Sequence, residues 1–112
     1  MSPRPPSASV QRTAPVFAAL GDETRLYVVA QLCANGPLSI SRLTEGSEVT
    51  RQAVTKHLTV LEDAGLVRGY RAGRERVWEL EPGRLDDARR TLDLISERWD
   101  AALERLRRMV EE

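Results

Sequence analysis

The sequence predicts a mainly helical fold with one small β-hairpin and a long helix at its C-terminal end. Three observations lead to this fold class. Apolar residues recur at helical spacing up to Gly65, and then the period changes from 3.6 to 2. A short loop at residues 72–74 separates two alternating segments, as in a hairpin. Beyond residue 84, apolar residues spaced by three and four continue to residue 109.

Length and composition indicate one globular domain. A chain of 112 residues has room for a single modest core. Its charged residues (30%) and hydrophobic residues (41%) are in ordinary proportions for a soluble protein. No apolar run approaches the roughly 20 residues that a membrane-spanning helix needs, and the N-terminus lacks the apolar stretch of a signal peptide. We therefore expect a cytoplasmic protein without a membrane partner.

The first residues differ in composition from the rest of the chain. Residues 1–13 contain three prolines and three serines with few apolar side chains, which predicts a disordered N-terminal arm. The folded domain is then expected to span residues 14–112. Pro15 suits the first turn of a helix, because its fixed φ is helical and its missing N–H has no helical partner there. Gly21 interrupts this first helix.

A second helix is predicted between Asp22 and a stop signal at residues 35–37. The Asp22 carboxylate can accept from free N–H groups of the next turn, and the Asn-Gly-Pro at the other end contains a glycine C-cap. The expected core-facing stripe consists of Leu26, Val29, Ala30 and Cys33. Cys33 is the single cysteine, so it cannot form an internal disulfide and we expect a small buried hydrophobe.

Two short helices and a hairpin follow. Ser39 is expected to cap a helix over residues 40–44, and Thr50 a helix over residues 51–64, with a tight glycine-containing turn between them. This arrangement predicts a helix-turn-helix. The strands expected at residues 66–71 and 75–80 then form a wing beside it.

The helix predicted at residues 51–64 has one apolar and one polar face. At 100° per residue, Val54, Leu58 and Leu61 point within about 40° of one direction, which is the core side. The opposite face carries amide, hydroxyl and ammonium groups and no acid. These groups can reach base edges and phosphates in a major groove of DNA. A solvated helix face is the alternative, and the adjacent wing favours the DNA-binding interpretation.

The wing carries an excess of arginine. Residues 64–78 contain four arginines and one acid, Glu75. Arg71 and Arg74 flank the loop, where they can contact phosphates or the minor groove, and Arg76 shares a strand face with Trp78. The alternative is a charged edge hairpin that prevents aggregation. The predicted DNA-binding residues are Arg51, Gln52, Thr55, Lys56, Thr59, Arg71, Arg74 and Arg76.

The last helix, predicted at residues 85–112, overhangs the domain. Its seam consists of Leu85, Ala88, Leu92, Ile95, Trp99, Ala102, Leu106 and Met109, an a/d pattern held for almost four heptads. A seam of this length needs a partner helix, so we predict a homodimer. The predicted dimer-interface residues are Phe17, Leu85, Leu92, Ile95, Trp99, Leu106 and Met109.

No residue set supports catalysis. The sequence has no glycine-rich phosphate loop, no HExxH or CxxC motif, and only one histidine, His57. We expect His57 to be a packed or hydrogen-bonding boundary residue of its helix rather than a metal ligand. Arg25 remains open between pairing with an acid and touching the DNA backbone. The chain is predicted not to be an enzyme.

Three segments resemble the ArsR/SmtB family of winged-helix repressors. Residues 17–25 read FAALGDETR, which resembles the family's F-x-A-L-x-D-x-T-R opening. Residues 53–58 (AVTKHL) and 61–67 (LEDAGLV) resemble its V-S-K-H-L-x-x-L-x-x-A-G-L-V signature. Residues 73–80 (GRERVWEL) resemble its G-R-x-x-x-Y-x-L wing.

The resemblance implies a homodimer built on the first and last helices, with DNA binding through the third helix and the wing. Metal sensors of the family carry a cysteine pair before the recognition helix, or His and Asp ligands on the last helix. Residues 40–44 contain no cysteine and the last helix no histidine, so we expect a metal-free branch without cofactor or indicated effector. The expected function is a repressor that binds a palindromic operator. The alternative is a winged-helix interaction module that does not read DNA.

Overall fold

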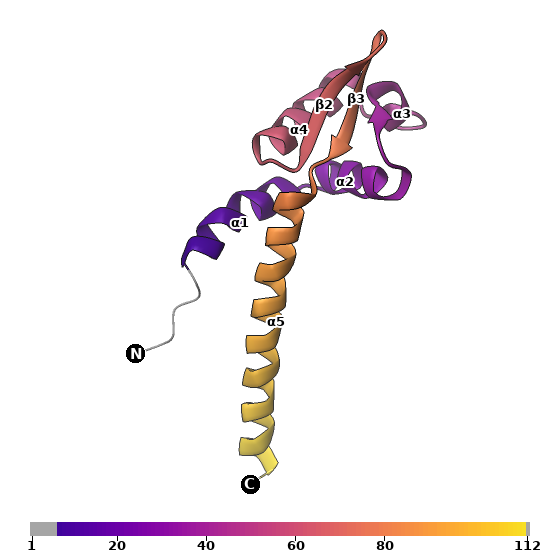
Figure 1. Cartoon of the computed structure of the whole chain (residues 1–112). Helices are drawn as coiled ribbons and strands as arrows, with labels where there is room; N and C mark the ends of the chain where they lie inside the picture. Colours follow the sequence, from indigo (N-terminus) through magenta and orange to yellow (C-terminus); the bar gives the residue numbers. More distant parts are fainter. Residues whose placement is uncertain (1–6, 112) are drawn as a thin grey trace.

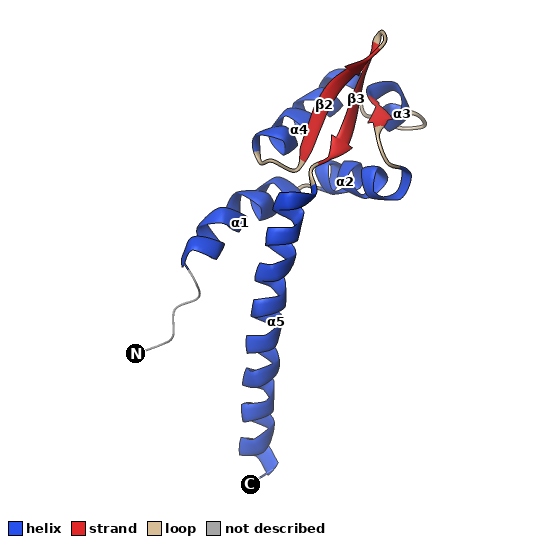
Figure 2. Cartoon of the chain, in the orientation of Figure 1, coloured by secondary structure: helices blue, strands red, loops and turns tan. Residues whose placement is uncertain are grey.

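The computed structural model describes residues 7–111, and this part of the chain forms a winged helix-turn-helix with a projecting C-terminal helix (Figure 1). Figure 2 shows a small sheet flanked by helices, with the last helix extending away from them. In chain order the elements are α1 (Ser7–Leu20), α2 (Glu23–Asn35), β1 (Leu38–Ser39), α3 (Ile40–Thr44), α4 (Arg51–Asp63), β2 (Val67–Ala72), β3 (Glu75–Leu80) and α5 (Pro82–Glu111).

Helix α1 corrects the expectation of a disordered arm over residues 1–13. Residues 7–13 are helical, whereas residues 1–6 lie outside the described part. The Thr13 side chain is 1% exposed and its hydroxyl donates to the Ser9 carbonyl at 2.7 Å. Arg12 pairs with Asp87 of α5 at 3.6 Å. Packing against α5 therefore stabilises a segment whose local propensity is poor.

Pro15 lies inside α1 rather than at its first turn. A proline inside a helix removes one backbone hydrogen bond and is normally unfavourable. The residues on either side of it are held by burial, because Thr13, Val16 and Ala19 all face the interior. Tertiary contacts thus keep α1 continuous through Pro15, the residue that had predicted its first turn.

Helix α2 has the predicted caps but a different buried face. The Asp22 carboxylate accepts from the Arg25 N–H at 3.0 Å, and Gly36 ends the helix at a φ of 75°. The buried residues are Val28, Val29 and Leu32. Of the expected stripe only Val29 is buried, and Leu26 (54% exposed), Ala30 and Cys33 face outward. Two apolar stripes overlap on this helix, so periodicity alone cannot select the one that packs.

The helix-turn-helix follows the sequence closely. The Ser39 hydroxyl accepts from the Arg42 N–H at 3.3 Å, and the Thr50 hydroxyl accepts from the Ala53 N–H at 3.1 Å. Both predicted N-caps are therefore confirmed. The inner face of α4 buries Val54, Leu58 and Leu61, as expected.

The wing is part of a three-stranded antiparallel sheet in the order β1-β3-β2. The strand β1 was not expected, because two residues are too few to show an alternating pattern. Leu38 of β1 pairs with Trp78, which on its other side pairs with Gly69 of β2. A Cβ at Gly69 would lie 2.9 Å from the indole ring, so only glycine leaves room for Trp78 in the core. The hairpin turns at residues 73–74, with Gly73 at a φ of 66°.

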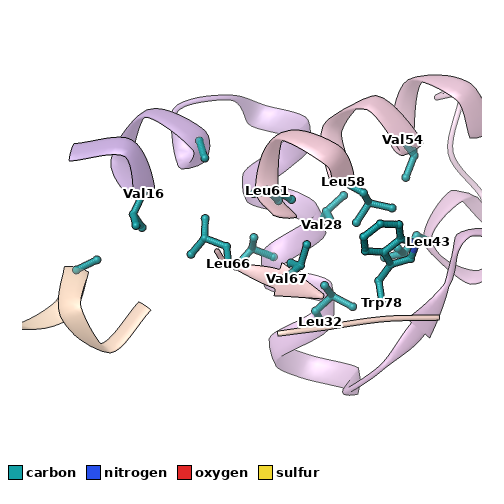
Figure 3. Close-up of a cluster of buried hydrophobic side chains, with 13 residues drawn as sticks. Val16, Val28, Leu32, Leu43, Val54, Leu58, Leu61, Leu66, Val67 and Trp78 are labelled. Atoms are coloured by element: carbon teal, nitrogen blue, oxygen red, sulfur yellow. The ribbon is translucent and has the colours of Figure 1, made fainter. Parts of the chain in front are cut away.

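The core lies between the sheet and helices α2 and α4, and Figure 3 shows its side chains converging there. Val16 of α1 and Ala88 of α5 extend it toward the long helix. Beyond Thr91 no residue of α5 up to Glu111 is fully buried. The part of α5 at residues 92–111 therefore projects from the domain (Figure 1). Between residues 7 and 111, no helix has the length and apolar character that crossing a membrane requires.

Candidate nucleic-acid interface

The outer face of α4 is exposed and carries no acid before its last turn. All five predicted residues on this face, Arg51, Gln52, Thr55, Lys56 and Thr59, are exposed. The Thr55 hydroxyl donates to the Arg51 carbonyl at 2.7 Å, and that of Thr59 to the Thr55 carbonyl at 3.0 Å. The hydroxyl protons of both threonines are therefore used within α4, and each hydroxyl oxygen can still accept a hydrogen bond. Gln52 and Lys56 add side-chain N–H donors to the same face.

The four arginines of the wing are not equivalent. Arg68 is bonded to Glu79 and lies 3.1 Å from the Glu81 carboxylate, so its charge is compensated. The hydrogen bond to Glu79 raises the pKa of the Arg68 guanidinium. Arg71 and Arg74 are exposed near the hairpin tip. Arg76 is exposed too, and its guanidinium carbon lies 5.0 Å from the centre of the Trp78 ring, which orients it by a cation–π contact.

Helix α4 and the wing meet at an open groove of about 320 Å³. Arg51 from the first turn of α4 lines it together with Arg74 and Arg76 from the hairpin. The Ser39 and Ser41 side of the groove comes from the start of α3. Glu75 also lines the groove, so its three guanidinium groups face one carboxylate and leave an excess of positive charge, which suits phosphate oxygens. Ser41 was not among the predicted site residues, because its proximity to the hairpin arises only from packing.

Arg25 of α2 and His57 of α4, for which the sequence predicted no partner, contact each other between these two helices. The Arg25 Nη1 atom is 3.3 Å from His57 Nδ1, and its Nε donates to the Ala19 carbonyl at 2.6 Å. The Asp22 carboxylate lies 3.7 Å from the same His57 nitrogen. The hydrogen bond from the Arg25 backbone N–H lowers the pKa of Asp22. His57 is thus a half-buried residue at hydrogen-bond distance from a partner, as predicted.

The predicted interface residues separate into two groups. Phe17 and Leu85 are half-buried and pack against the core of the same chain. The others are exposed, reaching 65% at Trp99 and 73% at Met109. Two neighbours outside the predicted seam, Leu103 and Val110, are also exposed and widen the apolar face. This distal seam is defined here as Leu92, Ile95, Trp99, Leu103, Leu106, Met109 and Val110.

Potential metal ligands are dispersed. Within residues 7–111, no three His, Cys, Asp or Glu side chains gather closely enough to hold a metal ion. Cys33 is an exposed free thiol, which corrects the expectation that it is buried. Its exposure follows from the rotation of α2, whose Val28 and Leu32 side turns inward instead.

Comparison with known proteins identifies the same fold. Residues 20–70 match a family described as a helix-turn-helix domain. The HTH-type transcriptional regulator Rv2034 of Mycobacterium tuberculosis is 41% identical over 87 residues, which cover 78% of each chain. The uncharacterized HTH-type transcriptional regulator YuzN of Bacillus subtilis is 44% identical over 68 residues, 55% of this chain and 74% of YuzN.

A solved structure extends the similarity to almost the whole chain. An ArsR-like transcriptional regulator from Rhodococcus sp. RHA1 superposes with a TM-score of 0.73 at 35% identity, covering 91% of this chain and 95% of that one. Fold, surface and relatives define a winged helix-turn-helix, DNA-binding transcriptional regulator. The chain belongs to the ArsR family of these regulators. The alternative of a module that does not read DNA therefore lacks support.

Proposed function

We propose that this regulator is a repressor that binds a palindromic operator as a homodimer. The observation that carries the proposal is the distal seam of α5. Apolar residues follow a coiled-coil spacing for five further turns beyond the core, and none of them is buried. A contiguous apolar face of this kind on a helix surface marks an interaction site. Its heptad pattern is the one that a second α-helix fills.

The partner helix is α5 of a second copy. A two-fold interface presents the same surface twice, so an uncharged, self-complementary stripe serves both subunits. The seam face is apolar, whereas acids and arginines alternate on the rest of the helix, for example Arg107 between Glu104 and Glu111. Phe17 and Leu85 contribute at the edge of this interface while remaining packed on their own core.

Each subunit then presents one α4 to DNA. Gln52 and Lys56 face the base edges, with Thr55 and Thr59 in contact beside them. Arg51, Arg71, Arg74 and Arg76 contact the phosphate backbone. Two such helices related by a two-fold axis read half-sites about one DNA turn apart, roughly 34 Å, which makes the operator palindromic.

Repression is the regulatory outcome that the relatives favour. The arsenical resistance operon repressor of Bacillus subtilis is 36% identical over 64 residues, which cover 57% of this chain and 61% of that protein. A dimer bound across a promoter acts by occupying it. The proposal places the protein in the cytoplasm with its DNA and assigns it no catalytic activity, metal, cofactor or effector.

The proposed contacts of α4 and the wing with DNA are tested by measuring binding of the chain to DNA from its own upstream region at two salt concentrations. Gln52→Ala is expected to relax base preference at one position of each half-site, because glutamine pairs bidentately with adenine. Lys56→Ala and Arg74→Ala should each weaken binding to all DNA sequences. Each should also reduce the salt slope, the dependence of log affinity on log salt concentration, by about one. Arg68→Ala is the matched control, since its charge is already compensated within the wing. An unchanged preferred sequence in Gln52→Ala would show that α4 is oriented differently.

A further inference from the structure

One side chain, that of Arg25, joins three helices. Arg25 lies in the first turn of α2, where its backbone N–H donates to the Asp22 cap at 3.0 Å. Its Nε donates to the Ala19 carbonyl in the last turn of α1 at 2.6 Å. Its Nη1 lies 3.3 Å from His57 Nδ1, midway along α4. The guanidinium therefore occupies the junction between α1, α2 and the recognition helix.

The chemistry of arginine defines the proton arrangement of this contact. A guanidinium has five N–H donors, no acceptor, and stays charged. The Nη1 contact is therefore a hydrogen bond only when His57 Nδ1 carries no proton and accepts. We assign the imidazole proton to Nε2 on that ground. The Asp22 carboxylate, 3.7 Å from Nδ1, is beyond hydrogen-bond distance and balances the arginine charge instead.

The two groups that the Arg25 side chain contacts, the Ala19 carbonyl and His57 Nδ1, belong to different parts of the molecule. Ala19 is buried in α1, the helix that packs along the first part of α5. His57 belongs to α4 and lies between its buried inner face and its exposed outer face. The fixed planar fork of the guanidinium holds both acceptors in one geometry. A change in the angle between α1 and α4 would break one of the two bonds.

We propose that Arg25 is a positioning residue for DNA recognition, which fixes the orientation of α4 relative to the α1–α5 scaffold through Ala19 and His57. In the homodimer this orientation sets the separation of the two recognition helices, and so the operator spacing that binds best. The inference rests on the proposed homodimer. It assigns Arg25 no direct contact with DNA.

The test compares the affinities of Arg25 variants for palindromic duplexes. The duplexes are those selected by the wild-type chain and copies whose half-sites are one base pair closer or farther apart. Arg25→Ala should weaken binding to the best spacing by about tenfold, the scale of one charge-assisted hydrogen bond. It should also reduce the discrimination between spacings, while the salt slope stays at the wild-type value. Arg25→Lys, which keeps one donor but not the fork, should be intermediate.

Variants of His57 supply the second arm. His57→Phe removes the acceptor and should reproduce the loss of spacing discrimination. His57→Asn keeps an acceptor oxygen near the Nδ1 position and should retain it. If the two residues act through one bond, Arg25→Ala combined with His57→Phe should be no weaker than the more impaired single variant. Arg90→Ala, which removes an exposed arginine paired with Asp87, is the control for charge loss and should leave spacing discrimination unchanged.

Two results would overturn the inference. A salt slope reduced by about one in Arg25→Ala, with unchanged spacing discrimination, would make Arg25 a phosphate contact. Additive effects of the Arg25 and His57 substitutions would show that no bond couples them. Failure of the proposed function gives a different result, because the wild-type chain would then remain monomeric or bind palindromic and single half-sites equally.

Discussion

The two halves of α5 carry the same apolar repeat but differ in what covers it. At residues 82–91 the repeat packs against α1 and the core, and Ala88 is only 4% exposed. At residues 92–111 the repeat continues without any buried residue. Thr91 marks the boundary between the two halves, as the last buried position. One helix thus contains a segment that packs within its own chain and a segment whose apolar face no part of residues 7–111 covers.

This difference separates stability from assembly. A substitution in the first half removes contacts that hold the single subunit together. A substitution in the second half affects surface that the single subunit leaves in water. Spacing alone does not distinguish these cases, because the heptad pattern is the same in both halves. The position of the neighbouring helices makes the distinction, and the following predictions test it.

The largest effect is expected in the first half. Ala88→Asp would place an unpaired carboxylate in the core between α1 and α5, where desolvation is uncompensated. The free energy of unfolding should fall by about 3–5 kcal/mol. Thermal and urea denaturation at a fixed protein concentration measure this change. A variant as stable as the wild type would contradict the packing of α5 against the domain.

A smaller change in subunit stability, but a larger one in assembly, is expected from Trp99→Asp in the second half. Trp99 is 65% exposed in the single chain, so its replacement removes few contacts within the subunit. The dimer dissociation constant should rise about 100-fold or more, as for aromatic residues at the centre of interfaces. Sedimentation and far-UV circular dichroism together should show a folded monomer. Unfolding of this variant would mean that the second half also stabilises the isolated subunit.

The N-cap of α4 is expected to show a moderate effect that is independent of α5. Thr50→Ala removes the oxygen that accepts from the Ala53 N–H and should cost about 1 kcal/mol of stability. Thr50→Ser keeps the acceptor and is the matched control. Chemical denaturation measures the cost, and sedimentation should show unchanged self-association. A change in the dimer constant would contradict the separation of α4 from the subunit interface.

The smallest effect concerns pH at the junction of α1 and α2. The pKa of Asp22 is lowered below its usual 3.8, chiefly by the Arg25 N–H. Because the folded pKa lies below the unfolded one, this carboxylate stabilises the fold fully above pH ~4 and less as pH falls through the folded pKa. Asp22→Asn keeps a capping oxygen without titrating. Denaturation between pH 6 and 3 should show a smaller acid-induced loss in the variant. Equal losses would contradict this account.

The sequence predicted best those features that depend on local chemistry. The caps at Asp22, Ser39 and Thr50 were identified because a side-chain oxygen three residues before a free N–H is a local arrangement. The polar face of α4 and the apolar seam of α5 follow from the rotation per residue within one helix. The elements and surfaces defined in this way are the ones that the structure retains.

The features that the sequence did not predict depend on packing between elements. Residues 7–13 look unfavourable for a helix until α5 lies beside them. The inner face of α2 was assigned to Leu26 and Cys33, although Val28 and Leu32 take it, because both stripes are apolar. The short strand β1 exists only through its pairing with β3. The bridge of Arg25 to His57 joins residues 32 positions apart, a separation at which local patterns carry no information.

The central claim is tested most directly by the mass of the wild-type chain in solution, determined by sedimentation equilibrium at micromolar concentration. Two exposed alanines supply a matched pair. Ala102 occupies an a/d position beside the distal seam, between Trp99 and Leu106, whereas Ala101 lies about 100° farther from the seam around the helix. We expect a dimer for the wild type and for Ala101→Asp, and a shift toward monomer for Ala102→Asp. A wild-type chain that stays monomeric, or equal behaviour of the two variants, would contradict self-association through the second half of α5.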